Sequence, residues 1–123
     1  QTLWPDHCIQ DTSGAAFHKD LHIPNAELII RKGFREEIDS YSAFFENDRK
    51  TPTGLGGYLK ERGFEKVVCV GLAFDYCVRF SAEDARRLGF ETEVIEAACR
   101  SIDLDGSAAA ARKSFQEHGI ALA

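Results

Sequence analysis

The chain is predicted to be an α/β protein, in which a mostly parallel sheet lies between two layers of helices. Two observations predict this class. Strand and helix patterns alternate from residue 26 to the end of the chain, and the segment 65–72 is apolar and β-branched, as expected for a strand covered on both faces. Strands that alternate with helices form parallel sheets, because each helical crossover brings the chain back to the same end of the sheet.

The first part of this alternation surrounds a long connection. A short strand is expected at 26–31, and a charged connection without clear periodicity follows at 33–50. Connections of that length are more often functional than idle. A helix is expected at 55–62, where Gly63 supplies the C-terminal stop.

The central elements are a strand at 65–72 and a helix from about 76 to 88. Apolar residues recur on one side of this helix, and Gly89 ends it. The buried stripe is expected to consist of Val78, Ala82, Ala85 and Leu88.

The last elements repeat the pattern. A strand is expected at 90–97, followed by a helix that Asp105 or Ser107 caps and that stops at Gly119. A final short strand is expected at 120–122.

Composition limits the compartment and the partners. The 123 residues suit one domain, and the net charge of −5 argues against nucleic acid or an anionic membrane as a partner. No apolar run approaches the roughly 20 residues that span a bilayer. The four cysteines lack the dense spacing of a secreted disulfide scaffold, so we expect reduced thiols in a cytoplasmic protein. The chain opens within an apparent loop and contains no methionine, so we expect residues 1–123 to form one N-terminally incomplete domain.

The segment 67–78 carries the strongest functional signal. It reads as a buried strand that passes through a short turn into a helix, which puts Cys77 at the carboxyl edge of the sheet and in the first turn of that helix. Open α/β folds bind ligands at this edge, and the helix N-terminus favours a thiolate there. The alternative is that the cysteine packs as a small hydrophobe, which we prefer for Cys69 and Cys99.

Lys32 directly follows the strand expected at 26–31. One interpretation puts its ammonium at the same sheet edge, beside Cys77, where it would stabilise a thiolate. The alternative is a solvated lysine at a strand end, and the sequence position alone favours this alternative.

Three motifs, in this order, resemble those of the nicotinamidases in the isochorismatase-like cysteine hydrolase superfamily. They are Trp-Pro-Asp-His-Cys at 4–8 with 12–18, Arg-Lys-Gly at 31–33 with 39–44, and Gly-Leu-Ala-Phe-Asp-Tyr-Cys-Val at 71–78. The resemblance covers nearly the whole chain. It implies a three-layer, isochorismatase-like (Rossmann-like) fold whose N-terminal strand and helix are missing from this chain.

The resemblance also implies catalytic roles. The family uses an Asp–Lys–Cys triad, in which Cys77 matches the nucleophile and Lys32 the lysine. Leu72 and Ala73 match a cis peptide of the family, and the N–H groups of Ala73 and Cys77 would form the oxyanion hole. The triad aspartate and the other metal ligands of the family precede Trp4, so this chain is expected to lack them.

The implied reaction is hydrolysis of nicotinamide to nicotinic acid and ammonia through a cysteine thioester, in pyridine nucleotide salvage, with pyrazinamide as a further substrate. His7 matches a ligand of a divalent metal that holds the pyridine nitrogen. We expect zinc, with iron or manganese as alternatives. The residues assigned to the substrate pocket are Trp4, Tyr41, Leu72 and Tyr76.

Two positions depart from the family pattern. Asp11 stands where glycine is frequent, which puts the conformation of that turn in question. Phe74 stands where threonine is common, and we interpret it as a tolerated variation in the pocket. The missing segment would remove a central strand and expose sheet edges, so we expect it either as a separate chain or outside this sequence. The enzyme itself is expected to be a homo-oligomer.

Two other functions stay open. A different amidohydrolase of the superfamily, with a ureido or carbamoyl substrate, would keep Cys77 and Lys32 but need no metal at His7. An inactive fragment that acts as an oligomerisation or interaction module would fit the lack of a triad aspartate. We expect no activity from this chain by itself.

Overall fold

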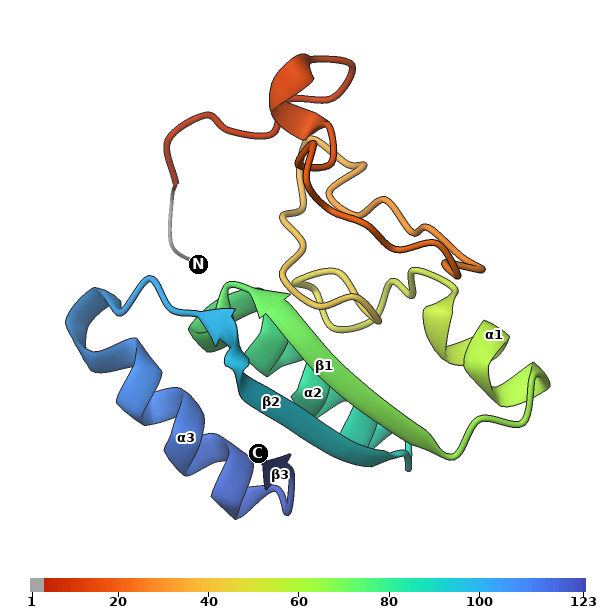
Figure 1. Cartoon of the computed structure of the whole chain (residues 1–123), viewed down its shortest axis with the longest axis vertical. Coiled ribbons are helices and arrows are strands. Elements are labelled where there is room, and N and C mark those ends of the chain that lie inside the picture. Colours follow the sequence, from red (N-terminus) through yellow and green to blue (C-terminus); the bar gives the residue numbers. More distant parts are fainter. Residues whose placement is uncertain (1–3) are drawn as a thin grey trace.

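The computed structural model describes residues 4–123 and contains a three-stranded parallel sheet (Figure 1). The strands β1 (Lys66–Leu72), β2 (Glu91–Arg100) and β3 (Ala121–Leu122) lie in the order β1-β2-β3. Both strand pairs are parallel, which confirms the predicted α/β class. Within the described residues β1 pairs with β2 alone, so it forms an edge of the sheet rather than its centre.

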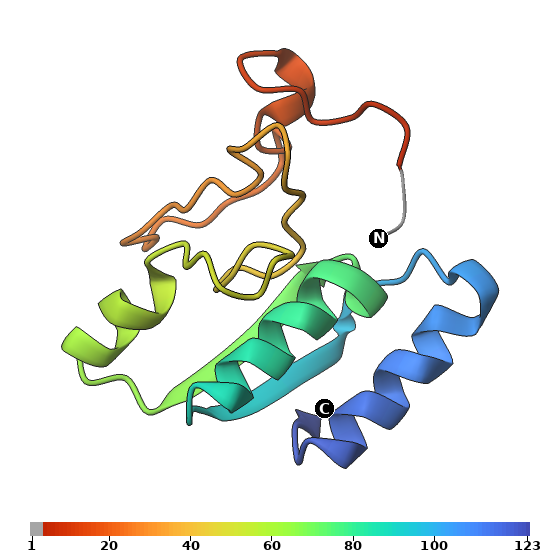
Figure 2. The same ribbon diagram turned by 180° about the vertical axis from the view of Figure 1, so that it is seen from behind.

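Two helices, α2 (Arg79–Arg87) and α3 (Ser107–Glu117), lie over one face of this sheet, and α1 (Leu55–Glu61) lies beside the edge strand β1 (Figure 2). A π-helical turn at Phe74–Val78 lies directly before α2. Short 3-10 turns occur at Ser13–Ala15 and Leu104–Gly106. In residues 4–123 we find no helix with the length and apolar character needed to cross a bilayer.

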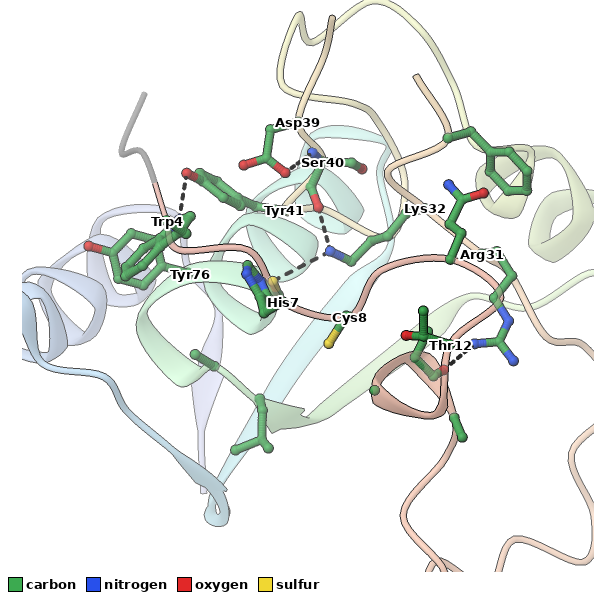
Figure 3. Close-up of a pocket in the computed structure, with 18 of the residues that line it drawn as sticks. Trp4, His7, Cys8, Thr12, Arg31, Lys32, Asp39, Ser40, Tyr41 and Tyr76 are labelled. Atoms are coloured by element: carbon green, nitrogen blue, oxygen red, sulfur yellow. Dashed lines mark hydrogen bonds between the residues drawn. The ribbon is translucent and has the colours of Figure 1, made fainter. Parts of the chain in front are cut away.

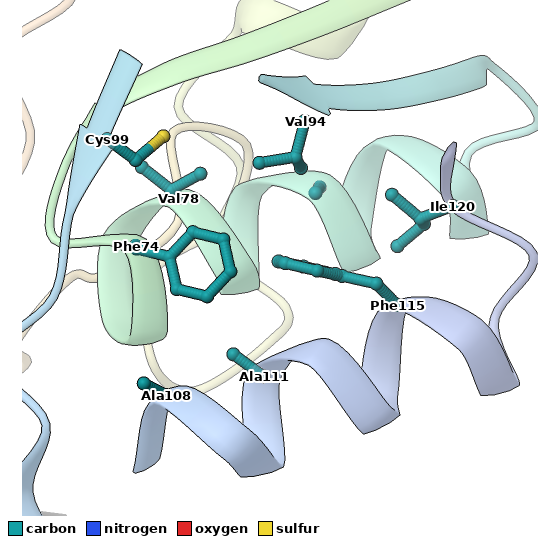
Figure 4. Close-up of a cluster of buried hydrophobic side chains, with 9 residues drawn as sticks. Phe74, Val78, Val94, Cys99, Ala108, Ala111, Phe115 and Ile120 are labelled. Atoms are coloured by element: carbon teal, nitrogen blue, oxygen red, sulfur yellow. The ribbon is translucent and has the colours of Figure 1, made fainter. Parts of the chain in front are cut away.

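The main core fills the space between the sheet and the helices α2 and α3 (Figure 4). The Phe74 ring packs edge-on against Phe115, with 5.4 Å between the ring centroids. Phe74 is 1% exposed, so its interpretation as a pocket residue is wrong: the side chain lies in the core instead. The cluster comprises Phe74, Val78, Ala82, Val94, Cys99, Ala108, Ala111, Phe115 and Ile120.

The other face of β1 is open. Side chains alternate along the strand, and Val68, Val70 and Leu72 are 47%, 54% and 71% exposed. The expectation that 65–72 is covered on both faces is therefore wrong for the described residues. Two of the three predicted layers, the sheet and one helical layer, are present there.

The segment before α1 is largely irregular. The strand expected at 26–31 is not observed, because this stretch has no neighbouring strand among the described residues with which to pair. Leu28 and Ile29 are 42% and 57% exposed, whereas a core strand would bury one of two neighbours. The connection at 33–50 is irregular as predicted, and Phe44, 2% exposed, holds it against Ala85 of α2.

Helix α3 begins differently from the prediction. Its N-cap is Gly106, with φ 81°, and neither Asp105 nor Ser107 caps it. Instead the Asp103 carboxylate accepts a hydrogen bond from the N–H of Ala108 at 3.1 Å, while the Ser107 hydroxyl donates to Asp75 at 2.6 Å. The capping side chain thus belongs to Asp103, three residues before the N-cap position Gly106.

We expect Phe74→Ala to lower the free energy of unfolding by about 3–5 kcal/mol, because the lost ring leaves a cavity against Phe115. Urea unfolding followed by circular dichroism measures this change. Phe34→Ala is the control: Phe34 is 64% exposed, so the change should stay within about 0.5 kcal/mol. A loss below roughly 1 kcal/mol for Phe74→Ala would show that the ring is not part of the core.

Candidate active site

A cavity of about 1220 Å³ opens between the carboxyl end of β1 and the irregular N-terminal segment (Figure 3). Three stretches of chain line it, within 4–16, 30–41 and 72–77, together with Ile102. This is the sheet edge at which the sequence predicted a site.

The turn after β1 determines where Cys77 lies. The peptide bond between Leu72 and Ala73 is cis, as the family resemblance implied, and the chain then enters the π-helical turn. The Ala73 carbonyl accepts hydrogen bonds from the N–H groups of Tyr76 at 3.1 Å and Val78 at 3.0 Å, on either side of Cys77. Cys77 is half-buried and its side chain lines the cavity.

Lys32 reaches this thiol from the irregular segment. Its Nζ donates a hydrogen bond to Cys77 Sγ at 3.5 Å and a second, short one to the carbonyl of Ser40. Ser40 is buried, so its carbonyl is a fixed acceptor for the ammonium. The two residues are 45 positions apart in the sequence, and a cation at this distance stabilises a thiolate.

Three aromatic side chains stand together beside the thiol. Trp4 Nε1 donates to the Tyr41 hydroxyl at 3.1 Å. The Tyr76 ring meets Trp4 and Tyr41 edge-on, at centroid distances of 5.0 and 5.7 Å. Leu72 lines the same cavity, so the structure brings together all four residues that the sequence assigned to a substrate pocket.

His7 is exposed on the cavity wall. Its Nδ1 lies 2.7 Å from the carbonyl of Pro5, and because a carbonyl can only accept, Nδ1 carries the proton. In the neutral imidazole the lone pair is then on Nε2, as a metal ligand requires. Residues 4–123 contain no group of three or more His, Cys, Asp or Glu side chains placed to hold a metal, so this part of the chain alone does not fit one.

Two residues that follow His7 adopt unusual backbone conformations. Asp11 has φ 62° and Cys8 has φ 48°, both in the left-handed region. Asp11 thus takes the conformation for which glycine is favoured, and aspartate is among the residues that adopt it most readily. Cys8 lines the cavity as a second thiol, which the sequence interpretation did not assign although it directly follows His7.

The remaining cysteines are structural, as predicted. All four thiols of the chain lie in the described part and are free. Burial, with a smaller contribution from Cys99, raises the pKa of Cys69 to about 11. Burial likewise raises the pKa of the Cys99 thiol.

A cysteine beside a lysine ammonium, at the carboxyl edge of a parallel sheet, defines an α/β protein with a cysteine-centred site. The chain belongs to the isochorismatase domain family, which it matches over residues 1–122.

Individual relatives are close in sequence and structure. A nicotinamidase of Acinetobacter baylyi is 52% identical over 120 residues, which cover 98% of this chain and 56% of the relative. The structure of PnC1 from L. infantum in complex with nicotinate has a TM-score of 0.94 and 38% identity, and the match covers 98% of this chain and 60% of that chain. A pyrazinamidase of Pyrococcus horikoshii in complex with zinc has a TM-score of 0.84 and 30% identity, with 98% and 63% covered.

This chain is thus shorter than the proteins that it matches. It spans about half the length of the curated relatives.

We expect iodoacetamide at pH 8 to label Cys8 and Cys77 and to spare Cys69 and Cys99. The first two line an open cavity, whereas burial keeps the Cys69 thiol protonated, with a pKa of about 11. Peptide mass spectrometry after timed quenching measures each site, and the same reaction in urea, where all four should react, is the control. Fast labelling of Cys69 in the native protein would contradict the assigned packing.

Proposed function

We propose that this chain carries the nucleophile and substrate pocket of a nicotinamidase, which hydrolyses nicotinamide to nicotinic acid and ammonia and also accepts pyrazinamide. The observation that carries the proposal is the 3.5 Å contact between Lys32 Nζ and Cys77 Sγ in a cavity with an aromatic wall. An activated thiol attacks carbonyl carbon, and flat aromatic side chains suit a pyridine ring. The relatives' names and the bound nicotinate in one of them support this substrate.

In the proposed mechanism Cys77 attacks the carboxamide carbon as a thiolate that the Lys32 ammonium stabilises. The N–H groups of Ala73 and Cys77 donate to the oxyanion of the tetrahedral intermediate. The proton that the thiol loses ends on the leaving nitrogen, so ammonia departs and a thioester remains. Water then hydrolyses the thioester and restores the thiol.

The proposal needs a group that moves this proton. Among residues 4–123, the partners of the Lys32 ammonium are a carbonyl and a thiol, not a carboxylate. We therefore propose that the triad aspartate comes from outside residues 4–123, as the family resemblance implies.

We further propose that residues 1–123 are one N-terminally incomplete domain, completed by a segment on a separate chain within a cytoplasmic homo-oligomer. The open face of β1 and its free edge support a missing neighbour. The size of the cavity also supports a missing segment, because its volume of about 1220 Å³ exceeds the roughly 300–1,000 Å³ of most small-molecule sites.

His7 is proposed to be one ligand of a divalent metal, with zinc favoured over iron and manganese. Its free Nε2 and the zinc complex of a relative support this assignment. The other ligands would have to come from outside the described residues.

The second candidate is an amidohydrolase of the same family that acts on a ureido or carbamoyl group without a metal. The isolation of His7 among the described residues favours it. Both candidates use Cys77 and Lys32, and they differ in their requirement for metal.

The first experiment measures ammonia release from nicotinamide by the purified protein together with its N-terminal segment. We expect Cys77→Ala to lower the rate by at least about 10³-fold, because the nucleophile is lost. Cys99→Ala removes a thiol from the core rather than the cavity and should keep the activity of the folded fraction. Residual hydrolysis in Cys77→Ala at the rate of the parent protein would exclude this residue as the nucleophile.

The second experiment measures bound metal by elemental analysis after extensive dialysis. We expect His7→Ala to lose most of the metal that the parent retains, since one imidazole ligand is removed. His22→Ala, which alters an exposed histidine outside the cavity lining, should keep it. A parent protein that is fully active without metal would favour the second candidate.

A further inference from the structure

Asp75 is a buried carboxylate two residues before Cys77, and it faces away from the cavity. Its side chain is 1% exposed and contacts the loop between β2 and α3. Oδ1 accepts a hydrogen bond from the N–H of Ile102 at 3.1 Å. Oδ2 accepts two more, from the N–H of Asp103 at 2.7 Å and the hydroxyl of Ser107 at 2.6 Å.

These contacts keep Asp75 charged in a nearly dry environment. Burial raises the pKa of this carboxyl, but hydrogen bonds from Ser107, Ile102 and Asp103 outweigh it and hold the pKa below its usual range. A buried charge is costly unless it is fully hydrogen-bonded, and bonds to an ionised acceptor are about twice as strong as neutral ones. The carboxylate therefore joins two segments that are almost 30 residues apart in sequence by strong, directional bonds.

Both of the joined segments belong to the cavity. On one side Asp75 lies within the π-helical turn that presents Cys77. On the other side Ile102 lines the cavity with a side chain that is 51% exposed.

The loop between β2 and α3, which Asp75 contacts, contains unfavourable backbone conformations. Asp103 and Asp105 have φ values of 57° and 51°, in the left-handed region that non-glycine residues seldom adopt. Such conformations persist where the surroundings fix them. The bonds from Asp75 to the N–H groups of Ile102 and Asp103 supply that constraint directly at the cavity wall.

We propose that Asp75 is a positioning residue, whose carboxylate fixes the Cys77 turn and the Ile102 wall relative to each other. The role in turnover rests on the proposed nicotinamide hydrolysis. Asparagine in its place turns a donor toward the N–H and O–H groups that now donate to the carboxylate. The turn then shifts relative to Lys32, and a displacement of about 1 Å at a reacting group can cost 100-fold in rate.

The test uses three variants of the protein with its N-terminal segment present. Asp75→Asn is expected to lower kcat for nicotinamide by about 10-fold or more, with a smaller change in KM. Ser107→Ala removes one of the three donors and should lower kcat less, in the same direction. Asp105→Asn is the matched control, because it makes the same charge change in the same loop at a backbone conformation that asparagine accepts, outside the contacts of Asp75.

The second readout is the rate at which iodoacetamide alkylates Cys77, followed by mass spectrometry between pH 6 and pH 10. We expect Asp75→Asn to slow the reaction at pH 7 by roughly threefold or more, because the shifted turn moves the thiol relative to the Lys32 ammonium. Asp105→Asn should follow the parent at every pH. This readout needs no turnover, so it tests the positioning of Cys77 even if the parent releases no ammonia from nicotinamide.

The outcomes distinguish a role of Asp75 in positioning Cys77 from a role in the stability of the fold alone. A lower melting temperature for Asp75→Asn, with kcat and the alkylation profile unchanged in the folded protein, would overturn the proposal. If Asp75→Asn does not fold, Ser107→Ala decides: a reduced kcat with slower alkylation at pH 7 supports the role, and parent values for both overturn it. Failure of the parent to hydrolyse nicotinamide would reject the proposed function alone.

Discussion

The packing of the turn after β1 into the core is the constraint on which the rest of the site depends. Phe74 and Val78 are buried against α3 and β2, and they bracket Cys77 at the two ends of the π-helical turn. Since both ends point into the core, the thiol between them is directed toward the cavity. The core cluster therefore does more than stabilise the domain, because it sets the direction in which the Cys77 thiol points.

Two charged side chains act on this turn from opposite sides. Lys32 approaches the thiol from an irregular segment, with its ammonium held by the Ser40 carbonyl. Asp75 binds the loop behind the turn. The ammonium and the carboxylate therefore contact different parts of the molecule, the Cys77 thiol and the loop between β2 and α3.

The sequence predicted the parts of this arrangement that local patterns decide. The strand–helix alternation and the carboxyl-edge position of Cys77 follow from apolar periodicity and helix stops, and the structure has both. It could not predict features that depend on distant partners. The segment 26–31 has strand-like residues but no strand to pair with, and Phe74 reads as a pocket residue until Phe115, 41 positions later, packs against it. Ile102 likewise carries no local signal of its place in the cavity wall.

The open face of β1 has a consequence for how the chain behaves in solution. Val68, Val70 and Leu72 form an apolar row next to a strand edge that no other described strand covers. Such an edge can pair with another strand through its unpaired backbone N–H and C=O groups. The apolar row beside it adds an exposed hydrophobic patch. The exposed row and the open edge of β1 thus together form a surface through which two copies of the isolated chain would pair at high concentration.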